Sequence, residues 1–182
     1  LNNWRDKLYA LRLIGVYTNG IGYGNISIRR EGKQFIISGT DTGKYEKLDA
    51  RHYTLVTEYD LAQNTLTTVG PIKASSESLT HAVLYDHSKD INAVIHVHHL
   101  GLWKKLLNNV PTTNDVAYGT PAMANEVIRL LKESDLPRQK IMVMAGHREG
   151  VVTFGNDLTE AGERIVHELA AFEREVERMK KR

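Results

Sequence analysis

Short apolar segments joined by short polar turns constrain the fold of this chain more than any other feature. Residues 24–30 alternate apolar and polar side chains, as a half-buried strand does, and residues 34–40 follow after a tight turn. Residues 53–60 and 65–69 form a second pair of this kind. Strands with such short connections pair in antiparallel fashion, because parallel neighbours need a long crossover.

Helical patterns separate and follow these strands. We expect helices over residues 2–20, 75–88, 100–109, 120–134 and 158–182, and further strands over residues 91–99, 140–147 and 150–155. Thr120 followed by Pro121 is a typical helix start. Strands and helices do not alternate regularly, so the sequence predicts an α/β fold with a mainly antiparallel or mixed sheet covered by helices. No repeat, low-complexity tract or linker divides the chain, which predicts a single domain over residues 1–182.

Composition narrows the function classes. A net charge of +2 gives no electrostatic reason to expect nucleic acid or an anionic membrane as a partner. The absence of cysteine excludes disulfides and thiolate ligands, so a metal would be held by His, Asp or Glu. With no apolar run near the roughly 20 residues that a bilayer requires and no signal-peptide pattern, we expect a cytoplasmic location. The chain starts at Leu1, so we expect a few residues before it, and a targeting signal there stays open.

The segment AVIHVHHLG, residues 93–101, places histidines at the end of an apolar strand. Side chains two apart on a strand share a face, so His96 and His98 point together, while His99 points away or begins the next loop. The pair can be hydrogen-bonded core histidines or paired metal ligands. His147 also follows an apolar strand, in a glycine-flanked turn, and is the candidate third ligand. Three imidazoles with an open position are typical of catalytic zinc.

Glu77 is the carboxylate most suitably placed to move protons at such a site, in the expected first turn of the helix over residues 75–88. It can equally serve as a favourable negative charge at a helix N-terminus. His81 lies one turn further on and is interpreted as structural or as supporting the site. The remaining histidines lie in polar surroundings and receive no role: His52, His87 and His167.

Two glycine-rich stretches do not predict nucleotide binding. Residues 19–25 follow a helix and lead into a strand, the wrong context for a dinucleotide fingerprint, and residues 39–45 depart from a P-loop in spacing and in Tyr45. Small hydrogen-bonding residues instead mark three element boundaries: Gly24-Asn25, Ser38-Gly39 and Ser75-Ser76. Each is compatible with ordinary turn chemistry. Together, with Lys73 nearby and a helix N-terminus, they could cradle a phosphate.

The segments GNISIR, ISGT, KASSESLTHAVLY, NAVIHVHH, YGTPAMANEV and MAGHREGVVTFGNDLTEA, in this order, resemble the class II aldolase/adducin family, over roughly residues 5 to 175. Its zinc-dependent members include fuculose-phosphate aldolases, a ribulose-phosphate 4-epimerase and a methylthioribulose-phosphate dehydratase. The resemblance implies a three-layer α-β-α fold. It also implies a four-fold symmetric homotetramer with active sites between subunits.

The resemblance also implies roles for single residues. His96, His98 and His147 match the family's zinc ligands, one zinc per subunit, and Glu77 matches the carboxylate that approaches the metal and shuttles protons. Other divalent metals stay possible, because His and carboxylate ligands also accept them. The residues that match the family's phosphate-binding positions are Gly24, Asn25, Ser38, Gly39, Ser75 and Ser76.

The implied activity is that of a zinc-dependent, aldolase-type lyase acting on a small phosphorylated sugar through a metal-stabilised enediolate. Dehydration or 4-epimerisation of a sugar phosphate at the same site, and a substrate without phosphate, stay open. So does a non-catalytic, adducin-like interaction module, although such a module would be expected to lose metal ligands. The chain lacks the longer segment that carries the aldolases' proton-donating tyrosine, and Tyr118 aligns with the later Gly-Thr motif instead. The family's aldolases also have a C-terminal tail that covers the site, and this sequence ends soon after the helix expected over residues 158–182, so the resemblance supports metal binding better than a particular substrate. The second acid or base is not identified.

Overall fold

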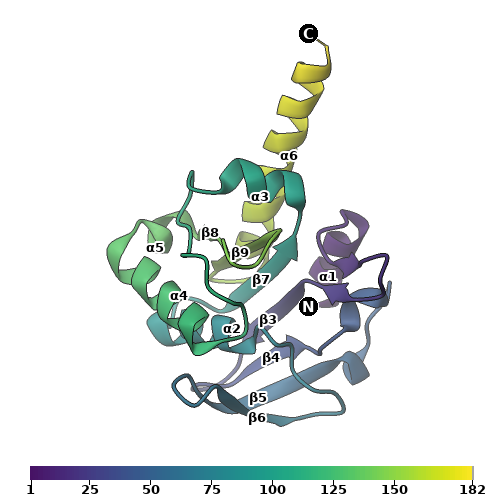
Figure 1. Ribbon diagram of the computed structural model, residues 1–182. Helices are drawn as coiled ribbons and strands as arrows, with labels where there is room; N and C mark the ends of the chain where they lie inside the picture. Colours follow the sequence, from purple (N-terminus) through teal and green to yellow (C-terminus); the bar gives the residue numbers. More distant parts are fainter. Residues whose placement is uncertain (182) are drawn as a thin grey trace.

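A seven-stranded sheet in the order β6-β5-β4-β3-β7-β9-β8 forms the centre of the computed structural model, which describes residues 1–181 (Figure 1). Every neighbouring pair of strands in it is antiparallel. The strands are β3 (Asn25–Arg29), β4 (Phe35–Ser38), β5 (Tyr53–Asp60), β6 (Thr65–Val69), β7 (Ala93–His98), β8 (Ile141–Val143) and β9 (Gly150–Gly155). The predicted α/β fold with an antiparallel sheet is confirmed.

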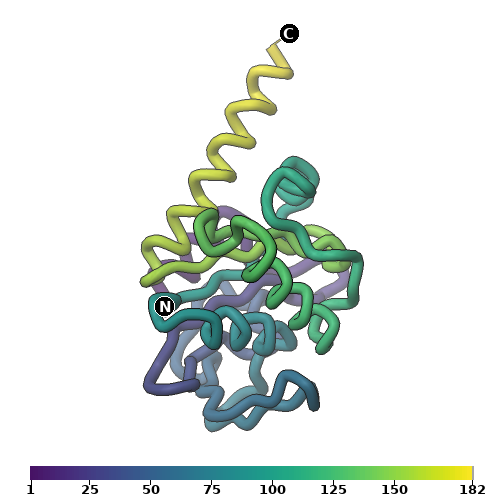
Figure 2. Tube along the Cα trace, turned by 90° about the vertical axis from the view of Figure 1, so that its left-hand side faces the viewer, coloured from purple at the N-terminus to yellow at the C-terminus, as the bar shows by residue number. Residues whose placement is uncertain are grey.

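Helices cover both faces of this sheet (Figures 1 and 2). One face packs against α2 (Ser78–His87), α4 (Pro121–Glu133) and α5 (Leu136–Gln139). The other packs against α1 (Asn2–Ala10), α3 (Leu100–Leu106) and α6 (Leu158–Lys180), whose C-terminal half projects from the body. The two apolar cores lie on opposite sides of the sheet, which is the three-layer arrangement that the family resemblance implies.

Alternation along β7 decides where its histidines lie. Ala93, Ile95 and Val97 belong to the core beneath α1, α3 and α6. Val94 belongs to the core beneath α2 and α4. His96 and His98 have the parity of Val94, so they emerge on the α2 side at the end of the strand. The fold thus presents both imidazoles to the start of α2.

The first helix is shorter than predicted. We expected it to run to residue 20, but α1 ends at Ala10. Arg12 adopts a left-handed backbone with φ 57°, and Leu13 N–H donates to Leu8 O at 2.9 Å while Arg12 N–H donates to Tyr9 O at 2.9 Å. This is a Schellman cap, in which glycine is the usual left-handed residue. Because arginine occupies that position here, the sequence carried no sign of the helix end.

Two short strands outside the main sheet pack against a 3₁₀ helix. β1 (Gly15–Val16) and β2 (Gly22–Tyr23) pair antiparallel, and the 3₁₀ helix η1 (Thr42–Lys44) packs on them. A Cβ at Gly43 would lie only 2.1 Å from Gly15 O, so this contact requires glycine. The glycine-rich stretches of the sequence therefore serve close backbone packing.

Other boundaries agree closely with the predictions. Thr120 caps α4 and its hydroxyl accepts from Met123 N–H, with Pro121 as the first helical residue. The helix predicted to start near Ser75 begins instead at Ser78, after a turn closed by Ser78 N–H on Ser75 O at 3.1 Å. The short helices α5, η1 and η2 (Ala50–His52) were not predicted. No helix within residues 1–181 is both long and apolar enough to traverse a membrane.

Candidate active site

The three predicted histidines converge at one end of the sheet. His96 and His98 come from the end of β7, and His147 comes from the turn between β8 and β9. Their ring centroids are 4.8 Å apart for His96 and His98, 5.0 Å for His96 and His147, and 4.6 Å for His98 and His147. One nitrogen of each ring can be chosen so that all three lie within 4.8 Å of one another. A divalent cation can bridge nitrogens at such separations after small side-chain adjustments.

The polar atoms left without partners fit a cation. Among the described residues, His96 Nε2, His147 Nδ1 and Glu77 Oε1 are buried and have no hydrogen-bond partner. Buried polar atoms are nearly always satisfied, so three such atoms at one place fit a site for a cation, which Glu77 Oε1 and the unprotonated ring nitrogens could bind. A Cβ at Gly150 would lie 3.2 Å from His96 Nε2 and 3.3 Å from His147 Cγ. Glycine at this position keeps that space open.

Burial holds all three imidazoles in the neutral form that binds metals. Burial lowers the pKa of His96 well below its usual value, and the neighbouring histidines lower it further. It lowers the pKa of His98 to about 3 and that of His147 to about 4. Near neutral pH a metal would therefore not compete with protons for these ligands.

Glu77 faces the histidines from the N-cap position of α2, and only 2% of it is exposed. Its Oε2 accepts from the Thr80 hydroxyl at 3.2 Å, and its Oε1 lies 3.6 Å from His147 Nδ1. Because His147 is neutral, this approach is not an ion pair. Burial raises the pKa of Glu77 to about 7, so the carboxyl group can both take and return a proton near neutral pH.

Two other histidines have structural roles. His99 accepts from Leu102 N–H at 3.0 Å and so caps α3, in agreement with the expectation that it begins the next element. His81 is fully buried, and its Nδ1 lies 2.7 Å from the Ser27 hydroxyl, which also lies 2.6 Å from Tyr85 Oη. His81 therefore belongs to a polar group beneath the site.

A cavity of about 240 Å³ opens beside the histidines. It is lined by most of the residues predicted for the site: Gly24, Asn25, Gly39, Ser75, Ser76, Glu77, His96, His98 and His147. Ser38 does not line it, because its hydroxyl accepts from Ile26 N–H at 3.2 Å and ties β4 to β3. The side-chain amide of Asn25 contacts His96 Nδ1 at 3.2 Å. If its oxygen, which has no other partner, accepts from Nδ1–H, the lone pair of His96 is left on Nε2. Lys73 is exposed outside the lining, so an anion here would depend on N–H and hydroxyl groups.

Several lining residues were missed from the sequence. Tyr118 stacks on His147 with ring centroids 4.0 Å apart and an interplanar angle of 16°. Tyr17 Oη lies 2.8 Å from His98 Nδ1 and donates to Glu149 Oε2 at 2.8 Å; burial, then this carboxylate, raises the pKa of Tyr17. Tyr23 stacks on His98 at 5.5 Å. No local sequence pattern predicts that these tyrosines lie at the site, because the residues they contact are distant in sequence.

The metal-free protein is expected to lose stability as the pH falls below 6.5. The pKa values of His81, His96, His98 and His147 are lowered by burial, so below 6.5 the unfolded chain binds more protons than the folded one. Each costs up to about 1.4 kcal/mol per pH unit until it protonates in the fold. Glu77 opposes this between its ordinary 4.5 and about 7, because its raised pKa lets the fold bind the extra proton.

The four histidines have a larger effect than the one carboxyl group, so the free energy of unfolding is expected to decrease as the pH falls. Urea denaturation of the metal-free protein at pH 7.5 and pH 5 measures it. Equal free energies of unfolding at the two pH values would mean that these histidines are solvated in solution.

Comparison with known proteins agrees with this architecture. Residues 16–102 match the model of the Class II Aldolase and Adducin N-terminal domain. A probable L-ribulose-5-phosphate 4-epimerase of Mycoplasma pneumoniae is 37% identical over 76 residues, which cover 42% of this chain and 30% of that protein. The chain thus matches less than a third of the length of this relative.

Solved structures extend the likeness in fold to nearly the whole chain. An L-fuculose 1-phosphate aldolase superposes with a TM-score of 0.71 at 20% identity, covering 98% of this chain and 84% of that one. A sugar-phosphate aldolase from Thermotoga maritima superposes with a TM-score of 0.72 at 16% identity, covering 98% and 92%. The resemblance to the class II aldolase and adducin family is confirmed, in sequence for residues 16–102 and in fold for nearly the whole chain.

Proposed function

We propose that this chain is a metal-dependent enzyme that acts on a small phosphorylated sugar, with aldol cleavage as the leading reaction and zinc as the metal. The observation that carries the proposal is the set of buried, partnerless polar atoms of His96, His147 and Glu77, which lies beside His98 at the wall of a cavity. The names of the structural relatives, which include sugar-phosphate aldolases, support the same chemistry.

The residues divide the work between holding a metal and moving a proton. His96, His98 and His147 would hold the metal, with Glu77 within reach of it. A divalent metal in such a site polarises a carbonyl and stabilises the negative charge that develops when a neighbouring bond breaks. Glu77 Oε1 would take or return the proton; burial raises the pKa of Glu77 to about 7 in the metal-free protein, and a bound cation would lower it. Because Glu77 is buried, bulk water does not return its pKa to the ordinary value.

The substrate phosphate would lie at the start of α2. The Ser75-Ser76 turn precedes this helix, where N–H groups and the helix dipole favour an anion. Gly24, Asn25 and Gly39 line the same cavity and add backbone and amide groups. Ser38 would contribute only through its backbone, because its side chain is committed to β3.

A second candidate is 4-epimerisation of a sugar phosphate. It is favoured by the relative from Mycoplasma pneumoniae, whose matching segment spans 76 residues. Both reactions break a bond next to a polarised oxygen, so the same metal and the same carboxyl group can serve either. The family resemblance also leads us to propose a homotetramer, which light scattering would measure.

Metal content and product analysis test the proposal. The protein is purified without chelator or metal-affinity resin and compared with His96→Ala by mass spectrometry of bound metals. About one zinc per chain is expected, with loss of the metal in the variant. Phosphorylated ketoses are then screened by NMR, which separates cleavage into two carbonyl fragments from epimerisation and dehydration. A wild type that neither contains metal nor takes up added zinc would leave an interaction module as the better account.

A further inference from the structure

The hydroxyl group of Tyr17 joins His98 to a carboxylate. Tyr17 Oη lies 2.8 Å from His98 Nδ1 and 2.8 Å from Glu149 Oε2. Tyr17 lies just after β1, in a turn closed by its N–H on Ile21 O and by Gly20 N–H on its own carbonyl, each at 2.9 Å. The phenol is therefore fixed by its backbone as well as by its two polar contacts.

The donors and acceptors of His98, Tyr17 and Glu149 allow only one pattern of hydrogen bonds. A carboxylate only accepts, and a phenol has a single proton to donate. Tyr17 thus donates to Glu149, and its oxygen must accept from His98 Nδ1–H. The proton on Nδ1 leaves the lone pair of His98 on Nε2, the form that a metal ligand needs. Hydrogen bonds of this kind behind a ligand are known to orient it and to raise its basicity.

The backbone of Glu149 determines which replacement is suitable. Its φ is 75°, in the left-handed region that favours glycine. Replacement by glycine therefore removes the carboxylate that accepts from the Tyr17 hydroxyl group without adding backbone strain.

We propose that Tyr17 and Glu149 are positioning residues, which fix the tautomer and ring orientation of His98 for metal binding. This inference rests on the proposed metal site and adds to it a supporting pair that no short sequence motif contains. In this role Tyr17 and Glu149 act through His98.

Tyr23 offers a matched control. Its ring stacks on His98 with centroids 5.5 Å apart and packs at a tilt of 42° against Tyr17 with centroids 4.5 Å apart, so it shares the same aromatic packing. Its hydroxyl, however, lies 3.5 Å from Arg12 O and makes no hydrogen bond to the imidazole. Tyr23→Phe therefore removes a neighbouring hydroxyl group but keeps the hydrogen bonds that link Glu149 and Tyr17 to His98.

The test is a zinc affinity measured by competition with a chromophoric chelator, together with the visible spectrum of the cobalt-substituted protein. Tyr17→Phe and Glu149→Gly are expected to weaken zinc binding about 10- to 100-fold and to change the cobalt spectrum, whereas Tyr23→Phe binds like wild type. Metal-free Glu149→Gly should unfold no more easily than wild type, because glycine relieves the strained backbone. A variant that binds zinc more weakly but has the same free energy of unfolding as wild type has lost the positioning of His98 and not the stability of the fold.

The outcomes distinguish this inference from the proposed function. If wild type binds zinc and Tyr17→Phe and Glu149→Gly both bind as tightly as Tyr23→Phe, the positioning role is wrong and the metal site stands. If Tyr17→Phe fails to fold, the zinc affinity of Glu149→Gly alone tests the positioning role, because this variant removes the acceptor of the Tyr17 hydroxyl proton. If wild type binds no metal, the proposed function and this inference fail together.

Discussion

Glu77→Gln is expected to lower turnover about 10²- to 10⁴-fold, the usual contribution of a positioned general acid or base, while the protein keeps its bound metal. Glutamine has the shape of glutamate but cannot take up a proton at Oε1. The histidines do not depend on this side chain for their positions, because His96 and His98 are fixed by β7 and His147 by its own turn. Steady-state kinetics on the identified substrate and metal analysis of the variant measure the two effects separately.

Glu160→Gln is the matched control for this loss. Glu160 lies in the first turn of α6, and its carboxylate pairs with Lys140. Its replacement removes a charge at a helix start without touching the cavity. Equal turnover in the two variants would show that Glu77 acts only as a charge at the start of α2.

Stability gives a second way to separate the two roles of Glu77. The side chain makes no capping hydrogen bond to α2, and burial raises its pKa to about 7. Above that pH the metal-free fold carries a buried carboxylate at a cost, which the neutral glutamine avoids. Metal-free Glu77→Gln should therefore be at least as stable as wild type at pH 8. A less stable variant would favour the helix-start role.

The sequence could predict elements whose signals are local. β5 and β6 have the predicted bounds because alternation marks each residue of a strand with one exposed face. The start of α4 was predictable because Thr120 and Pro121 form the cap by themselves. The period of two also sufficed to place His96 and His98 on one face, since no distant contact can alter that parity.

Features that depend on distant partners could not be predicted. The end of α1 depends on Arg12 in a backbone conformation that arginine seldom adopts. Ser38 was grouped with the loops because glycine follows it, whereas its strand turns the hydroxyl towards β3. The contact between Tyr17 and Glu149 joins residues 132 positions apart. Only the assembled sheet brings the β1 turn and the β8–β9 turn together.

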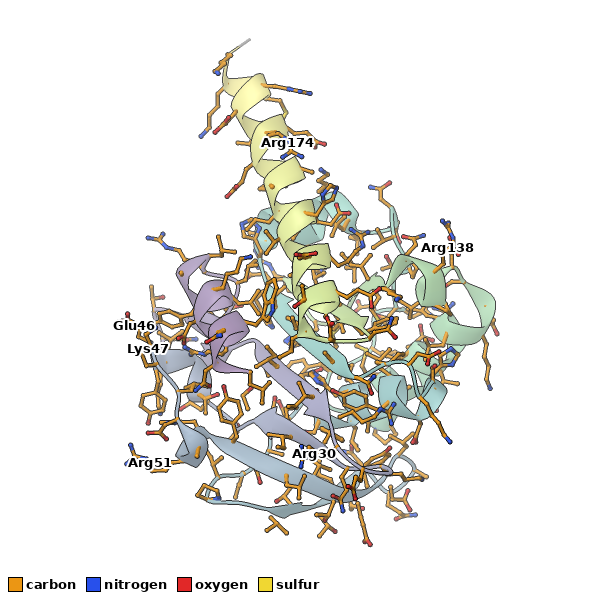
Figure 3. All side chains as sticks on the ribbon, turned by 180° about the vertical axis from the view of Figure 1, so that it is seen from behind. Arg30, Glu46, Lys47, Arg51, Arg138 and Arg174 are labelled. Atoms are coloured by element: carbon orange, nitrogen blue, oxygen red, sulfur yellow. The ribbon has the colours of Figure 1, made fainter. Side chains whose placement is uncertain are left out.

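Arg5 donates hydrogen bonds to the segment that forms part of the cavity wall, and no sequence pattern predicted a role for it. Only 1% of it is exposed, and its guanidinium donates to Glu46 O at 2.6 Å and to Thr42 O at 3.1 Å. It also lies 4.6 Å from the centre of the Tyr9 ring. Within residues 1–181 no carboxylate forms an ion pair with it, and burial lowers its pKa. Glu46 lies at the edge of the molecule beside α1 (Figure 3).

Arg5→Met is therefore expected to reduce the free energy of unfolding by about 3 kcal/mol, because two hydrogen bonds from a charged donor are lost and the Thr42 carbonyl is left buried without that donor. Methionine retains much of the apolar stem, so the loss reports on the guanidinium. Thr42 and Gly43 line the cavity, and release of their segment should also raise KM. Arg51→Met is the control: the Arg51 side chain is 81% exposed and points outward in Figure 3, so its replacement should leave the free energy of unfolding close to that of wild type.

Urea denaturation of both variants, with metal removed, measures the difference. The expected loss is a net value, because bringing a guanidinium out of water costs several kcal/mol that the bonds must first offset. If Arg5→Met were as stable as Arg51→Met, that cost would equal the gain, and Arg5 would determine only where the Thr42 segment lies. In that case KM would still rise in Arg5→Met and not in Arg51→Met, because the position of the cavity wall depends on the two carbonyl contacts and not on their net free energy.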